Sequence, residues 1–78
     1  MTGTSFENLS SLLQHHPARD VRLVTDGVAK LEGKGYRMVS AADAGDAVFV
    51  TLHRDDENGT VVDKNGKVVH VEFLKFTL

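Results

Sequence analysis

Three side chains of this sequence, those of His53, His70 and Glu72, could together bind a transition metal. His70 and Glu72 are two residues apart, so they would share one face of an extended strand. His53 lies on an earlier segment and would join them if the two segments paired in a matching register. Two imidazoles and one carboxylate can hold a zinc or nickel ion. We expect ordinary polar residues on a sheet surface instead, so no metal or other cofactor is predicted, and whether the three converge stays open.

Catalytic chemistry has little support in the sequence. None of the serines lies in the strand–turn–helix elbow that exposes a catalytic serine. The pairs His53–Asp55 and His70–Glu72 could transfer protons, but no sequence pattern indicates that they are buried. The absence of cysteine excludes thiol catalysis, disulfides and cysteine-based metal sites. We therefore predict that the protein is not an enzyme.

Acidic residues are concentrated in the middle of the chain. Among its 78 residues, nine Lys and Arg stand against eleven Asp and Glu. The formal net charge of −2 gives no general attraction to nucleic acid or to an anionic membrane. Six of the acids fall within residues 43–63, and three of them are consecutive at Asp55, Asp56 and Glu57. We predict that this acidic hairpin loop contributes to a protein interface.

Four basic residues lie along one edge of a predicted helix and just beyond it: Arg19, Arg22, Lys30 and Lys34. We call them the basic stripe. A stripe of this kind can contact phosphates. Asp26 interrupts it, however, and no aromatic side chain is interleaved to stack on a base. Nucleic-acid contact through the basic stripe is therefore the alternative function, less favoured than protein binding.

The spacing of apolar residues predicts two helices in the N-terminal half. The first carries Phe6, Leu9, Leu12 and Leu13 on one side and ends at His15, His16 and Pro17. The second covers residues 18–33, with an apolar stripe at Val21, Val24, Val28 and Leu31. A hairpin with Asp26-Gly27 as its turn is the competing interpretation. We favour the helix because its period of 3.6 residues crosses Asp26-Gly27 without a break.

Beyond Tyr36 the apolar period changes to two residues, which is typical of strands. We expect a short strand over 36–40, a turn over 41–46, a strand over 47–54, an extended piece at 61–62 and a long strand over 68–78. The expected fold class is α+β, with two N-terminal helices packed on a three- to four-stranded antiparallel meander. The whole chain, residues 1–78, is predicted to form one small domain.

The last strand has apolar residues at both sets of alternating positions. The odd-numbered set contains Val69, Val71 and Phe73, and the even-numbered set contains Leu74, Phe76 and Leu78. Either a bulge near Phe73–Leu74 brings the second set onto the first face, or both faces of the strand are apolar. Such a strand favours aggregation at a sheet edge unless a neighbour covers it. The helices, a second copy of the chain or another protein could provide that cover.

These patterns predict a small non-enzymatic protein-binding module, an inhibitor or adaptor of the kind carried by a phage or other mobile element. Its interface would comprise Phe73, Leu74, Phe76 and Leu78 together with the acidic hairpin loop. We expect a homodimer and an unidentified protein partner. No basic leader and no long apolar run is visible, so the expected location is the cytoplasm, without a membrane partner.

Overall fold

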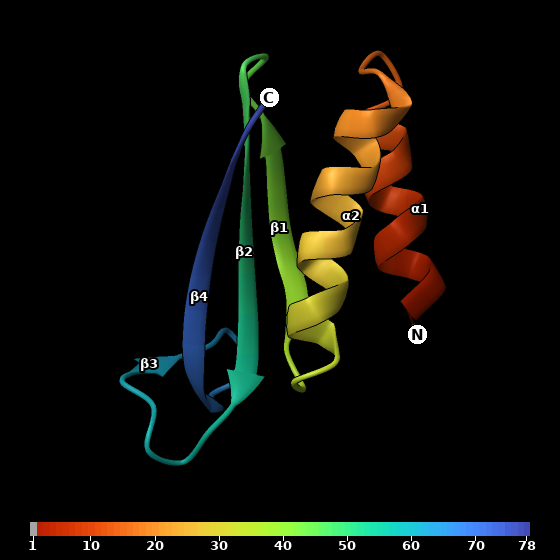
Figure 1. The fold of residues 1–78 in the computed structure, drawn as a ribbon. Helices are drawn as coiled ribbons and strands as arrows, with labels where there is room; N and C mark the ends of the chain where they lie inside the picture. Colours follow the sequence, from red (N-terminus) through yellow and green to blue (C-terminus); the bar gives the residue numbers. More distant parts are fainter. Residues whose placement is uncertain (1) are drawn as a thin grey trace.

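A computed structural model describes the backbone of residues 2–78 and the side chains of residues 7–78. The helices and strands follow one another as α1 (Thr2–Leu12), α2 (Ala18–Glu32), β1 (Arg37–Asp43), β2 (Ala47–Asp55), β3 (Val61–Val62) and β4 (Val68–Thr77). The strands form one antiparallel sheet in the order β1-β2-β4-β3, and both helices pack on the same side of it (Figure 1). The predicted α+β class is confirmed.

Residues 18–32 form the helix α2, so the competing hairpin is wrong. Pro17 precedes the helix with a φ of −57°, which suits a helix start. Val24 and Val28 are buried, as the apolar stripe predicts. Leu9 of α1 and Leu13 directly after this helix are also buried, whereas the side chain of Phe6 lies outside the described residues.

The hydrophobic core lies between the two helices and the middle of the sheet. On β2, alternate residues Val48, Val50 and Leu52 are buried against the helices. Their neighbours face the other way because side chains alternate along a strand. No helix within residues 2–78 covers that second side, so Phe49 remains 46 % exposed. We call this uncovered side of the sheet the open face.

Strand β1 is longer than the sequence pattern predicts. It continues through Ala41 and Ala42 to Asp43, so the expected turn over 41–46 is wrong. Ala41 pairs with Val50 and Ala42 with Phe49, and this pairing outweighs the weak strand preference of alanine. The register between β1 and β2 shifts between Met38 and Ser40, so this irregularity in the strand pairing lies in β1.

The pairing of β2 with β4 is unbroken from Ala47–Thr77 to Asp55–Val69. Strand β4 therefore has no bulge near Phe73–Leu74. Of the two predicted alternatives, the one with apolar side chains on both faces of the strand is correct. Leu74 pairs with Val50 and shares its helix-facing side, whereas Phe73 lies on the open face.

Gly27 allows α2 to approach the end of β4 closely. A Cβ atom at residue 27 would lie 2.5 Å from Cε1 and 2.6 Å from Cζ of Phe76. Such a separation is far shorter than a normal carbon–carbon contact. The helix thus accepts a glycine in its interior because the Phe76 ring occupies the space of a side chain.

Replacing Gly27 with Ala should lower the free energy of unfolding by about 1 kcal/mol. Ala is preferred to Gly inside a helix by about 1 kcal/mol, but overpacking of this kind costs about 2 kcal/mol. Urea denaturation measures the difference. In the Phe76→Leu background the obstructing ring atoms are gone, so Gly27→Ala should stabilise the fold. An effect of the same sign in both backgrounds would contradict the contact.

Candidate interaction surface

The three candidate metal ligands do not converge. His53 pairs with Val71 and therefore lies on the open face of the sheet. His70 pairs with Arg54 and, like Glu72, points to the helix-facing side. The His70 Nε2 and Glu72 Oε1 atoms are 3.0 Å apart on the surface. Within the part of the chain that the structure describes, no group of three or more His, Asp or Glu side chains gathers around a common point.

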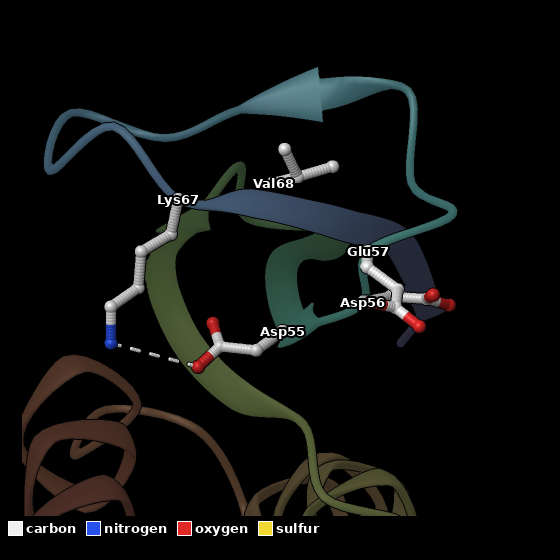
Figure 2. Close-up of a pocket in the computed structure, with 5 residues that line it drawn as sticks. All are labelled: Asp55, Asp56, Glu57, Lys67 and Val68. Atoms are coloured by element: carbon white, nitrogen blue, oxygen red, sulfur yellow. Dashed lines mark ion pairs between the residues drawn. The ribbon is translucent and has the colours of Figure 1, made fainter.

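The acidic hairpin loop borders a shallow hollow where β2 ends and β4 begins. Figure 2 shows Asp55, Asp56 and Glu57 lining it with Lys67 and Val68. The Lys67 Nζ atom lies 3.8 Å from an Asp55 oxygen. The other Asp55 oxygen lies 2.9 Å from an Arg37 nitrogen. Asp55 is thus already engaged by cations of its own chain.

Asp56 is also occupied within the loop. The backbone N–H of Asn58 donates to Asp56 Oδ1 at 3.0 Å, and Arg54 Nη2 lies 3.4 Å from Oδ2. The hydrogen bond from Asn58, supported by Arg54, holds the pKa of Asp56 below its usual range. Two of the three predicted acidic contact residues therefore shape the loop, which leaves less free charge for a basic partner.

Asp63 has a structural role that the sequence pattern did not predict. Its Oδ1 accepts backbone N–H groups of Asn65 and Lys67, both at 2.9 Å. Arg37 Nη2 on β1 donates to its Oδ2 at 3.3 Å. The N–H of Lys67 is the main cause of a lowered Asp63 pKa. Asp63 thus closes the β3–β4 turn and ties it to the far edge of the sheet.

The apolar residues of β4 divide between the two faces of the sheet. Phe73 stands on the open face with 76 % of its surface exposed. Leu74, Phe76 and Leu78 are half-buried and pack at the margin of the core. The predicted interface residues of β4 therefore form no single patch.

Phe49 on β2 is an exposed aromatic residue that the sequence prediction missed. The Nζ atom of Lys75 lies 5.9 Å from the centre of its ring, within the range of a cation–π contact. Its position between Val48 and Val50 on the strand places it on the opposite face, and this alternation could have predicted its exposure. The open face thus carries exposed aromatic surface on two neighbouring strands.

The acidic hairpin loop and the apolar end of β4 are far apart. Asp55 pairs with Val69, whereas Val48 pairs with Phe76. Seven residues of strand separate the two pairs, a length of about 23 Å. One partner would have to extend along most of β4 to contact both.

The basic stripe lies on the side of α2 that faces away from the sheet. Arg19, Arg22, Lys30 and Lys34 are all exposed, and none of them forms an ion pair with residues 7–78. Arg19 and Lys30 are separated by about three helical turns and fall on one side, opposite Val24 and Val28. The structure therefore places these four cations on an accessible surface.

Comparison with protein-family models, with curated proteins and with solved structures gave no match. Neither of the described helices is long and apolar enough to cross a membrane.

The Asp63 interactions should make stability depend on pH. Because the pKa of Asp63 is lower in the folded chain than in the unfolded one, its carboxylate stabilises the fold above the unfolded value. This contribution is lost as the pH falls below about 4 and through the folded pKa. Wild-type protein should lose more stability on acidification from neutral pH than Asp63→Asn, as measured by urea midpoints.

Asp26→Asn on the exposed side of α2 controls for simple removal of a negative charge. Equal loss of stability on acidification in wild type and Asp63→Asn would refute this role of Asp63.

Proposed function

We propose that the protein is a small non-enzymatic protein-binding module that binds through β4. One observation carries this proposal: β3 pairs with β4 only at Val68 and Val69, which leaves the rest of that edge without a partner strand in residues 2–78. The uncovered part carries apolar side chains on both faces, with Phe73 on the open face and Leu74 and Phe76 on the helix-facing side. An exposed strand edge of this kind binds another strand through main-chain hydrogen bonds, while its side chains determine specificity.

The hydrogen-bonding pattern identifies the backbone groups that such a partner would meet. The N–H of Leu78 donates to Asp46 O at 2.8 Å, and Val68 O accepts the N–H of Asp56 at 3.1 Å. Even-numbered residues of β4 therefore direct their backbone groups toward β2. In an antiparallel ladder the residues between them direct theirs to the opposite side. Those residues are Val71, Phe73, Lys75 and Thr77.

The position of Gly59 supports the same assignment. A Cβ atom there would overlap the carbonyl group of Val69, an odd-numbered residue of β4. The loop that leads into β3 thus passes directly over the edge opposite β2. Beyond this point the edge is available to a partner strand.

An inhibitor or adaptor is the kind of protein that this surface suits, because strand addition needs no catalytic residues. In this proposal the acidic hairpin loop is a secondary contact. Glu57 forms no ion pair with the side chains that the structure describes, so it is available to a partner that reaches this end of β4.

Lys75→Pro is a selective test of the β4 edge. The N–H of Lys75 points away from β2, so proline removes a group that the fold does not use but a partner strand would. Immobilised wild-type protein should retain a partner protein from a lysate of the source organism after nuclease and high-salt treatment. Lys75→Pro should retain at least tenfold less, and the matched control Lys75→Ala should retain most of it.

Circular dichroism must show that both variants keep the wild-type fold. Equal retention of a partner protein by wild type and Lys75→Pro would contradict protein binding through β4. A wild-type chain that retains no protein after nuclease and salt, and that also remains a monomer, would contradict it as well.

Nucleic-acid contact remains the second candidate because the four cations of the basic stripe have no ion-pair partner among residues 7–78. Binding of this type weakens steeply with salt. Two results together would support the basic stripe instead of β4. The bound material would be lost on nuclease treatment, and the double variant Arg19→Glu/Arg22→Glu would fail to retain it at low salt.

A further inference from the structure

We infer that the partner of β4 is a second copy of this chain, and that the two sheets join across a twofold axis at Leu74. Each copy contributes a four-stranded sheet, so the pair would form one continuous antiparallel sheet of eight strands. This inference rests on the proposed function, because it assigns an occupant to the same edge of β4.

The backbone of β4 is compatible with itself. In a twofold dimer the same edge of both copies meets, with the strands antiparallel. Two residues that pair across the axis must then point their side chains to the same side of the sheet. The axis therefore passes through a residue and not between two residues. Both copies present the backbone groups of odd-numbered residues, and each facing pair of such residues exchanges two hydrogen bonds.

Charge, space and the match between facing side chains select one register among those that centre on the free part of β4. An axis at Lys75 would place this cation directly opposite its copy, and like charges in that position are unfavourable. An axis at Phe73 would place Thr77 opposite Val69, whose edge is already paired with Val61. Axes at Leu74 and at Phe76 avoid both conflicts, but an axis at Phe76 would place Lys75 opposite Thr77 and not opposite an aromatic ring.

The register centred on Leu74 also brings complementary groups together. Phe73 of each copy faces Lys75 of the other on the open face, so the dimer gains two ammonium–aromatic pairs. The chain already holds Lys75 beside an aromatic ring, since its Nζ lies 5.9 Å from the centre of Phe49. A cation over an aromatic face is attracted by the electrons of the ring. Val71 faces Thr77, so these pairs place no like charges opposite each other.

The helix-facing side of β4 favours the same partner. The helices contact β1 and β2, and β4 lies at the margin of the layer that they form. Leu74 and Phe76 are therefore only half-buried. In the dimer, Leu74 meets its copy at the axis, and the helices of both copies flank this seam on the same side of the joined sheet. The helix-facing residues of β4 are thereby covered more fully, and Phe73 on the open face gains Lys75 of the other copy as a neighbour.

Disulfide formation at single cysteines tests the register, because the natural chain contains none. Leu74 would occupy a pair without mutual hydrogen bonds at the axis, where Cβ atoms are about 4.5–5.5 Å apart and within reach of a disulfide after small shifts. Leu74→Cys should form a covalent dimer rapidly under mild oxidation. Phe73→Cys is the matched control, because its copy is displaced by two residues, and it should react at least tenfold more slowly.

Faster reaction of Phe73→Cys than of Leu74→Cys would overturn the Leu74 axis. Equally slow reaction of both variants, at the rate of an exposed control such as Leu23→Cys on α2, would overturn the dimer.

Sedimentation equilibrium tests the dimer without cysteines. The mass of wild-type protein should rise from one chain toward two between low micromolar and millimolar concentration. Lys75→Pro should remain a monomer, and Lys75→Ala should dimerise several-fold more weakly because it loses only the ammonium–aromatic pair. A wild-type monomer at every concentration would overturn this inference. The lysate capture described above tests the proposed function separately. If wild-type protein retains a different protein and Lys75→Pro does not, the proposal of binding through β4 stands even though the dimer is refuted.

Discussion

The ladder between β2 and β4 is the constraint on which the other features of this molecule depend. It joins nine residue pairs in unbroken antiparallel register, from Ala47–Thr77 to Asp55–Val69. This register fixes which side chains of β4 face the helices and which occupy the open face. It also fixes which backbone groups point to β2 and which point to the opposite edge. Both the apolar surface and the pattern of free hydrogen-bonding groups follow from that one pairing.

The limited extent of the helical layer determines how much of this surface is covered. The helices pack on β1 and β2, so Val48, Val50 and Leu52 are fully buried while Leu74, Phe76 and Leu78 are only partly covered. Phe73 stays 76 % exposed. Complete burial of a side chain of this size contributes roughly 1.5–3 kcal/mol, so its exposure leaves free energy that association can recover.

The residue pattern predicted the elements with a strong period. The apolar stripe of α2 and the alternation of β2 each continue over enough residues to distinguish a helix from a strand. The end of β1 was not predictable in the same way, because Ala41-Ala42-Asp43 resembles a turn and becomes a strand only through its pairing with β2. Local preference carries no information about such a neighbour.

The candidate site was less predictable because it depends on register. A shift of one residue moves every side chain of a strand to the other face. His53 could therefore have joined His70 and Glu72 in one register, but it lies on the opposite face in the observed one. The ion pairs of Asp55 and Asp56 were equally unpredictable from the sequence. Arg37 lies far from Asp55 along the chain and reaches it only because β1 pairs with β2, and Arg54 approaches Asp56 through the local shape of the loop.

Amide hydrogen exchange, followed residue by residue by NMR at two protein concentrations, tests the central claim most directly. The amides of Leu74 and Phe76 point to β2 and should be protected at both concentrations. The amides of Phe73 and Lys75 point to the free edge, so they should exchange rapidly in dilute solution and become protected in concentrated solution. Rapid exchange of Phe73 and Lys75 at both concentrations would contradict pairing between copies, and rapid exchange of Leu74 and Phe76 would contradict the β2–β4 ladder itself.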